Sequence, residues 1–358
     1  MEGSRAPGGA VAIHFRTAKT MRSLLLLDMK LDDTATLISA KPLSKNPSGL
    51  LWGLLGVTAF SFTVPFTRIA VADGQLSALF VGSGRAVAAA LLAGAALFLT
   101  RQRIPRGRQW IQVAVVAGGA VAGFPLLTSF ALTTVPASHG AVVIAALPAA
   151  TAVMAVLRTG ERPARAFWIA AGAGGVAALG FAMLQGGGFG SLHWSDLLLF
   201  AAVIVCAVGY AEGGILSRSL GSWQTISWAL VLASPLMILL TGVAVAQQPP
   251  AGTAGQWAAF AYLSVASMFL GFIAWYRGLS IGPMAQVSQV QLAQPVMTIC
   301  WAASILQESI GWLTVLGGVT VIGCALLAVR ARSTGKPGSP RDGLGSARPP
   351  ADHRPASP

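Results

Sequence analysis

The hydrophobic pattern along this chain consists of ten long apolar runs separated by short polar turns. Each run has about the 20 residues that an α-helix needs to cross a bilayer core of about 30 Å. The pattern predicts ten membrane-spanning helices over residues 50–71, 75–99, 110–132, 136–157, 164–184, 195–217, 223–246, 256–277, 283–306 and 310–330. The separators, such as Ala72-Asp73-Gly74 and Gln248-Pro249-Pro250, are typical of turns.

The positions of Lys and Arg predict how these helices are oriented. Of the 24 Lys and Arg residues, 22 fall in the two terminal segments and in every second loop, and the alternate loops hold none. The other two, Arg68 and Arg85, lie inside predicted helices. By the positive-inside rule, both termini are cytosolic. The alternation also supports the number ten, because a missed span would scramble it.

The chain contains an internal repeat at a spacing of 147 residues. Segments 131–161 and 278–308 align without a gap and share eight identities in 31 positions. The aligned pairs Pro136/Pro283, Pro148/Pro295 and Glu161/Glu308 carry the most weight, because Pro and Glu are scarce in apolar helices.

Five helices per copy is an odd number, so the second copy enters the membrane in the opposite sense. The predicted fold is an all-α polytopic membrane protein of two five-helix inverted repeats, 50–184 and 195–330. Many secondary transporters have this architecture, which gives one central site two pseudo-symmetric access routes. The alternative is an old duplication retained only for packing, since channels and passive permeases also contain such repeats.

Composition agrees with a membrane protein and excludes several other classes. Apolar residues make up 54% of the chain and charged residues 10%, against roughly 25% charged in a soluble domain. The net charge of +13 is confined to one side, so we expect a lipid bilayer and no nucleic acid as partner. The three cysteines lie in apolar runs without metal-ligand spacing, so no metal or cofactor is expected.

The sequence also gives no sign of an enzyme. It has no phosphate-binding Gly-Lys-Ser/Thr motif, which argues against ATP as an energy source, and no serine nucleophile elbow. Residues 1–48 contain no run long enough to span a membrane, and 331–358 are rich in Gly, Pro, Ser and Arg. Both are predicted to be disordered cytosolic segments, with Met21 or Met29 as alternative starts.

Several motifs together resemble a known family. They are Gly84-Arg85-Ala86 in the second span, Gly160-Glu161-Arg162-Pro163 after the fourth, and Ala293-Gln294-Pro295 continuing to Glu308, followed by glycine-rich helices. Over about 50–330 the chain resembles the EamA-type ten-span permeases of the drug/metabolite transporter superfamily. The second copy reads Gln-Glu-Ser where the first reads Gly-Glu-Arg-Pro. The resemblance implies a bacterial inner-membrane permease, many of which export amino acids, other metabolites or drugs, some coupled to protons.

Two charged residues within the spans are candidates for chemistry. Arg85 is placed near the membrane midplane, where it can anchor a carboxylate-bearing substrate, pair with Glu212, or clamp backbone carbonyls. Glu212 is the proton-coupling candidate, because a desolvated carboxylate can exchange a proton near neutral pH. The competing interpretation is a permanent ion pair of Glu212 with Arg68, Arg85 or Arg218.

Polar side chains predict a substrate path along the ninth span. At 100° per residue, Gln286, Gln289 and Gln294 share one helix face, and Gln291 lies off it. His139, the counterpart of Gln286 in the repeat, is a candidate for the same path, with a simple hydrogen-bonded role as the alternative.

Aromatic residues in the sixth and eighth spans are further candidates for the path. Trp275, Tyr276 and Phe272 can stack on a flat or cationic substrate, and Tyr210, two residues before Glu212, is also a candidate for the path.

The repeated glutamates and prolines have structural interpretations. Glu161 and Glu308 end their spans and are predicted to cap the N-terminus of the next helix in the chain. Pro148 and Pro295 are hinge candidates, because a proline within a span frees a carbonyl and softens the helix.

The sequence as a whole predicts a secondary transporter that exports small metabolites or drugs, as a monomer or homodimer. It leaves open whether a proton gradient or the substrate's own gradient drives transport. A channel-like facilitator and a non-transporting receptor or scaffold are the alternatives.

Overall fold

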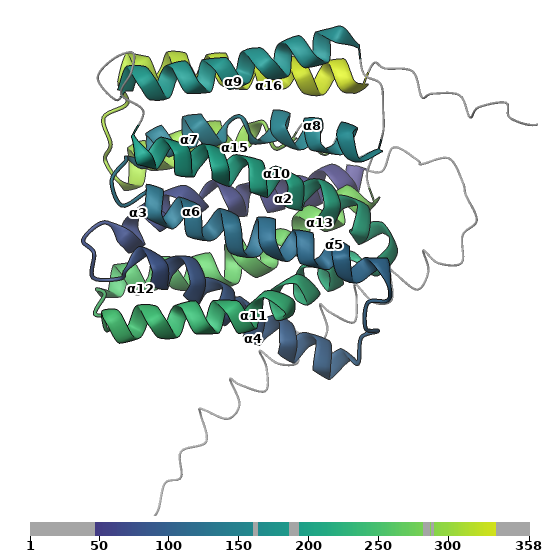
Figure 1. The fold of residues 1–358 in the computed structure, drawn as a ribbon. Helices are drawn as coiled ribbons and strands as arrows, with labels where there is room; N and C mark the ends of the chain where they lie inside the picture. Colours follow the sequence, from purple (N-terminus) through teal and green to yellow (C-terminus); the bar gives the residue numbers. More distant parts are fainter. Residues whose placement is uncertain (1–46, 160–163, 186–192, 282–286, 288–289, 334–358) are drawn as a thin grey trace, which may run out of the picture.

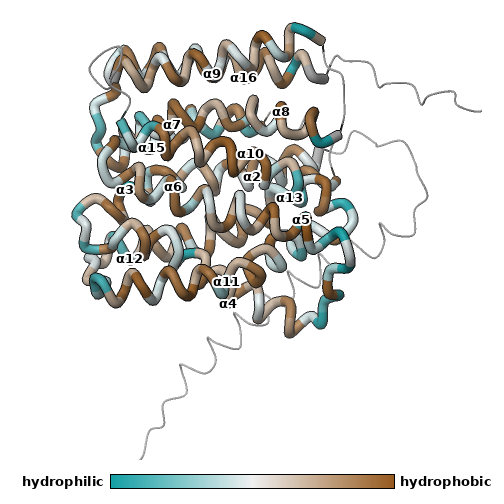
Figure 2. Tube along the Cα trace, viewed as in Figure 1, coloured by the Kyte–Doolittle hydropathy of each residue, from teal (hydrophilic) through white to brown (hydrophobic). Residues whose placement is uncertain are grey.

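The computed structural model describes residues 47–159, 164–185, 193–281, 287 and 290–333. Within these ranges the secondary structure is helical, with no strand. The helices run roughly parallel to one another in a single bundle (Figure 1). Polar residues gather at the two ends of the bundle and apolar residues along its middle (Figure 2), as a bilayer requires.

The first half is built from α2 and α3 (Pro47–Ser61, Thr63–Val71), α4 (Ala78–Thr100), α5, η1 and α6 (Arg108–Val116, Ala117–Gly123, Phe124–Ala131), α7 and α8 (Ala137–Ile144, Leu147–Thr159) and α9 (Arg165–Gln185). The second half has α10 (Trp194–Leu220), α11 (Ser222–Gln247), α12, η2 and α13 (Ala254–Tyr262, Leu263–Gly271, Phe272–Ile281), α15 (Ala293–Ile305) and α16 (Trp312–Ser333).

Nine helices within the described ranges are long and apolar enough to cross a membrane. They start and end within a few residues of nine of the predicted spans. The predicted ninth span, 283–306, is only partly described, as α15. The all-α polytopic fold is therefore confirmed, whereas the number ten stays a prediction. In Figure 1, α2 begins and α16 ends on the same side of the bundle.

Prolines explain where three spans are interrupted. A proline cannot donate a hydrogen bond to the carbonyl four residues earlier. Pro65 frees the carbonyl of Ser61, where α2 ends, and the hydroxyl of Thr298 on α15 donates to that carbonyl at 2.9 Å. Pro148 and Pro295 likewise follow the interruptions at Ala145–Ala146 and at Gln291–Leu292.

Two π-helical segments show that the repeat extends beyond its sequence identities. Segment η1 covers Ala117–Gly123, and η2 covers Leu263–Gly271. A shift of 147 residues carries η1 to 264–270, inside η2. Both copies therefore widen the helix at the same place, as expected of two related halves.

The two halves are interleaved. Helix α2 of the first half packs against α13 of the second, and α10 of the second packs against η1 and α6 of the first. Two further contacts pair helices that are equivalent in the repeat, α4 with α11 and α9 with α16, and a third joins α7 of the fourth span to α15 of the ninth. This pattern fits an inverted repeat whose halves share one core.

The contact between η1 and α10 depends on glycine. A Cβ atom added to Gly119 would lie 2.3 Å from the carbonyl oxygen of Val205, and one added to Gly209 would lie 2.9 Å from the nitrogen of Ala120. Two backbones therefore meet directly at this crossing, as small residues allow in membrane helices.

Candidate functional site

A small cavity lies at the centre of the bundle, between the two halves. Its volume is about 20 Å³. Its walls come from α2, α3, α4, η1, α6, α10, η2, α13 and α15 and consist of Phe60, Thr63, Val64, Arg85, Ala120, Phe124, Pro125, Tyr210, Ser267, Met268, Phe272 and Gln294. Three residues of the predicted path, Arg85, Tyr210 and Gln294, thus meet at one place. We call it the central cavity.

A second cavity, of about 10 Å³, adjoins the first through the shared residues Val64 and Gln294. Its wall includes Pro148 and Pro295, so it lies where α7/α8 and the ninth span are interrupted. The hinge candidates therefore lie beside the centre of the molecule. Their role as hinges stays a prediction.

Arg85, on α4, is buried and has few hydrogen-bond partners. Its side chain donates from Nη1 to the hydroxyl of Thr67 at 3.5 Å, and its Nε has no hydrogen-bond partner. Within the described residues neither proposed protein partner is present: Arg85 makes no ion pair with Glu212, and no backbone carbonyl accepts a hydrogen bond from it. Arg68 is the clamp instead, donating to the carbonyls of Leu132 and Thr133 at 2.8 and 2.9 Å.

Aromatic rings form one side of the central cavity. Phe60 and Phe272 are in edge contact, with ring centroids 4.9 Å apart, and Tyr210 lies 5.7 Å from Phe272. Trp275 and Tyr276 are fully buried behind them and are not on the wall of the central cavity. The predicted stacking of substrate on Trp275 and Tyr276 therefore has no exposed ring face in this conformation.

The glutamine pattern of the ninth span was partly wrong. The sequence predicted Gln294 on one helix face and Gln291 off it, yet both line the second cavity. The reason is the interruption at Gln291–Leu292, across which a constant 100° per residue does not hold. Gln291 is buried, and neither atom of its amide has a partner. Gln286 and Gln289 lie outside the described residues.

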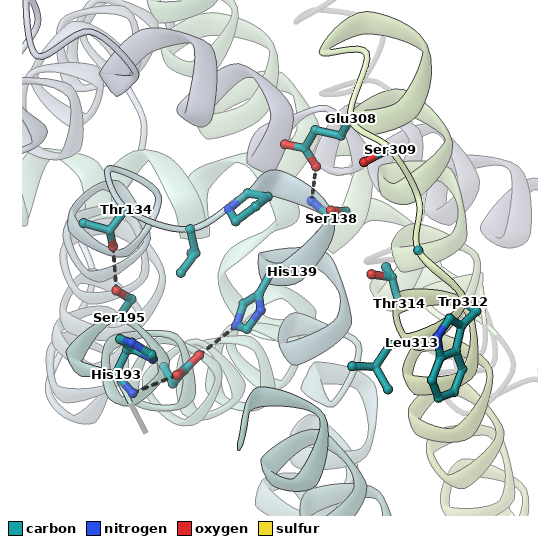
Figure 3. Close-up of a pocket in the computed structure, with 14 residues that line it drawn as sticks. Thr134, Ser138, His139, His193, Ser195, Glu308, Ser309, Trp312, Leu313 and Thr314 are labelled. Carbon is teal, nitrogen blue, oxygen red and sulfur yellow. Dashed lines mark hydrogen bonds and ion pairs between the residues drawn. The ribbon is translucent and has the colours of Figure 1, made fainter. Parts of the chain in front are cut away.

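A larger cavity of about 650 Å³ opens at the end of the bundle where α7, α10 and α16 begin. We call it the end vestibule (Figure 3). His139 of α7 faces it, with Nε2 2.7 Å from Oδ1 of Asp196 on α10. The other carboxylate oxygen of Asp196 accepts from the backbone N–H of His193 at 3.0 Å, in a capping box. The two side chains therefore join α7 to α10.

Asp196 was not among the predicted site residues. It lies three residues after His193, at the start of its span, so the sequence suggested only a helix terminus. The available signal was the capping-box spacing, which marks a helix start but says nothing about a histidine 57 residues earlier.

Glu308 also lies at the end vestibule, and its predicted target was wrong. Its carboxylate accepts from the backbone N–H groups of Ala137 and Ser138 at 2.8 and 2.9 Å, so it caps α7 and not the next helix, α16 (Figure 3). Pro136, before α7, has no side-chain hydrogen bond to offer these groups. The repeat brings the end of α15 beside the start of α7, so the cap comes from the other half. Glu161 lies outside the described residues.

Glu212, on α10, is held by partners that the sequence did not suggest. One carboxylate oxygen accepts from Nε of Arg158 at 2.6 Å, and the other accepts from Nη2 of Arg158 at 3.0 Å and from the Gln112 amide at 2.7 Å. The proposed partners Arg68, Arg85 and Arg218 were wrong, because the end of α8, which carries Arg158, packs against α10. The Arg158 side chain is 42% exposed and that of Glu212 only 5%.

The two ion pairs connect the same two spans at opposite ends. His139–Asp196 joins α7 to α10 at the vestibule end, and Arg158–Glu212 joins α8 to α10 at the other end. The interruption between α7 and α8 lies between them. The continuous helix α10 is thus bound to both parts of the interrupted fourth span, α7 and α8.

The described residues contain no group of three or more His, Cys, Asp or Glu side chains that can hold a metal ion.

Comparison with known proteins identifies relatives of the whole helical region. The model of the EamA-like transporter family matches residues 47–183 and again residues 193–330. The chain is 45% identical over 288 residues to the "Uncharacterized transporter YdeK" of Bacillus subtilis (strain 168), covering 80% of this chain and 99% of that protein. A solved crystal structure with 18% sequence identity shares the fold, with a TM-score of 0.56 over 80% of this chain and 98% of the other.

Proposed function

Because the chain belongs to the EamA-like transporter family, we propose that it exports small metabolites or drugs across the bacterial inner membrane by alternating access around the central cavity. The observation that carries this proposal is the position of the cavity. Residues from both halves line it, and three interrupted spans meet beside it. Transporters with inverted repeats bind substrate at such a place, between their halves and beside discontinuous helices.

The two ion pairs supply a mechanism for alternation. The positive-inside rule puts the end vestibule on the outer side and Arg158 on the cytosolic side, with both termini cytosolic. Separation of His139 from Asp196 frees the outer end of the broken span, and separation of Arg158 from Glu212 frees its inner end. Each half of the span then moves about the interruption near Pro148 while the other half stays bound to α10.

We infer that a proton gradient supplies the energy, because a proton and Arg158 compete for the Glu212 carboxylate. Protonation of Glu212 removes the negative charge that attracts Arg158, so the inner ion pair opens. A proton taken up at Glu212 thereby favours access from the cytosol.

The transport proposal is tested with purified protein in liposomes. A broad metabolite panel is offered under an imposed pH gradient, with empty liposomes as the control. We expect at least one compound to move faster than in empty liposomes, with a rate that saturates as its concentration rises. Equal rates for every compound would remove the basis of the proposal, and a rate that never saturates would indicate a channel-like facilitator.

Glu212→Gln tests the coupling separately. We expect this variant to lose proton-driven transport and to keep counterflow exchange, since an amide cannot release a proton. Asp73→Asn, which neutralises an exposed acid in a turn, serves as the matched control and keeps both activities. Unchanged proton-driven transport by Glu212→Gln would exclude Glu212 as the coupling residue.

A further inference from the structure

Arg85 is a buried cation that has no counter-charge among the residues that the structure describes. Its side chain is 1% exposed, and the two ion pairs of the described chain involve other residues. Its one hydrogen bond, to Thr67, is long at 3.5 Å, and the donor at Nε is unused. An unpaired charge in a membrane interior is costly, so its presence points to a functional site.

Arg68 shows what a structural arginine looks like in the same fold. Its Nη1 donates two short hydrogen bonds to backbone carbonyls just past the end of α6, where the helix dipole is negative. The charge of Arg68 is thereby compensated within the protein. In the part of the chain that the structure describes, Arg85 has no comparable contact, and the wall around it contains no acidic residue.

We propose that Arg85 binds the carboxylate of a small monoanionic substrate in the central cavity, an assignment that rests on the transport function proposed above. A guanidinium donates two parallel hydrogen bonds to a carboxylate, which would use the free Nε. One cation on an otherwise uncharged wall matches one negative charge. A doubly charged phosphate would keep a charge unpaired.

The other residues of the cavity wall indicate the chemistry of the substrate beyond its carboxylate. Phe60, Phe272 and Met268 offer an apolar surface suited to an aromatic or aliphatic body. The side-chain oxygen of Gln294 is buried without a partner, so it can accept from a hydroxyl or an amine next to the carboxylate. A volume of about 20 Å³ holds little more than one water molecule, so the substrate enters only when the halves separate.

Three carboxylates with one carbon skeleton probe this site: phenylacetate, mandelate with an added hydroxyl, and phenylglycine with an added amine. Phenylacetamide is the uncharged control. The melting temperature of the full-length protein in detergent is measured against ligand concentration, because a ligand that binds the folded state raises it. We expect the carboxylates to raise the melting temperature and phenylacetamide to leave it unchanged. Mandelate should bind more tightly than phenylacetate, whereas phenylglycine, whose ammonium group adds a charge without a partner on this wall, should not.

Variants assign the effect to residues. Arg85→Met should weaken carboxylate binding by about thirtyfold or more, and Arg85→Lys, which keeps the charge, should retain part of the preference. Gln294→Leu should make mandelate bind no better than phenylacetate. Arg103→Met, which removes an exposed loop arginine, should bind as the wild type does.

The protein without ligand provides an independent readout. If the charge of Arg85 is unpaired in the protein without ligand, its removal in Arg85→Met should raise the melting temperature by a few degrees. Loss of a structural contact would lower the melting temperature instead. A lower melting temperature for Arg85→Met, or equal binding of phenylacetamide and phenylacetate, would overturn the assignment. Neither readout depends on flux, so failed transport with carboxylate-selective binding would count against the transport function and leave Arg85 assigned.

Discussion

The carbonyl of Ser61 shows how a single residue in this membrane core is satisfied from another span. Pro65 leaves it without an intrahelical donor, and the Thr298 hydroxyl supplies one at 2.9 Å. The indole N–H of Trp301 donates to the Ser61 hydroxyl at 3.0 Å, so α15 binds the interruption twice. In the bilayer core no water is available to donate a hydrogen bond to such a carbonyl.

Thr298→Val tests the contribution of this hydrogen bond. The change keeps the shape of the side chain and leaves the Ser61 carbonyl unpaired, so the free energy of unfolding should fall by about 1 kcal/mol. Thr320→Val is the matched control, because its hydroxyl bonds only a carbonyl of its own helix. Equal thermal stabilities of the two variants in detergent would show that the bond between spans contributes nothing.

At this scale the sequence predicted residue types better than partners. It singled out Glu212 and Glu308 as functional or structural carboxylates, but it assigned the wrong arginines to the first and the wrong helix to the second. Both errors have one cause. The partner of a side chain at a helix end depends on which helices pack beside it. This packing cannot be read from the spacing of residues within one helix.

At the scale of elements, the helices and their interruptions followed from the sequence. Apolar length placed nine spans within a few residues. Pro148 marked the interruption in one of them, and Pro295 marked the one that precedes α15 in the partly described ninth span. The π-helical segments were not predicted, since no residue pattern in Ala117–Gly123 or Leu263–Gly271 requires them. The face of Gln291 was missed for a related reason: helical periodicity assumes an unbroken helix.

Pro148→Ala tests whether the interruption in the fourth span matters for movement. Alanine restores the N–H that can bond the Ile144 carbonyl, so α7 and α8 should join and stiffen. We expect transport in liposomes to slow at least several-fold, with a melting temperature equal to or above that of the wild type.

Pro235→Ala is the control for this change. Pro235 also lies inside a helix, but the carbonyl that it frees, that of Val231, already accepts from the Ser234 hydroxyl at 2.8 Å. Its transport rate should stay near the wild-type value. An undiminished rate for Pro148→Ala would rule out this interruption as a hinge.

At the scale of the whole molecule, the interleaving of the halves predicts that neither is stable alone. Helices α2 and α10 each find their main contacts in the opposite half, and two pairs of equivalent helices, α4 with α11 and α9 with α16, meet across the boundary. A half made alone would present these faces to lipid, including the glycine-lined surface of η1.

Separate expression of residues 1–188 and 189–358 tests this prediction. Each part alone should be degraded or should aggregate on extraction, whereas parts expressed together should co-purify through a tag on one of them. Two halves that are each stable in detergent and do not associate would contradict the shared core.

Interleaving also fixes the order in which the protein can be completed during synthesis. Of the described spans, the one that begins with α2 is made first, and its partner α13 follows only after six further described spans have been made. Until α13 is inserted, α2 lies in the membrane without its main partner helix. The surface of α2 at Gly56, against which the backbone of Trp275 packs in the folded protein, is then uncovered. Contacts so distant in sequence form slowly. The first span made is thus among the last to reach its native neighbour, which makes late assembly, and not insertion, the step most exposed to error.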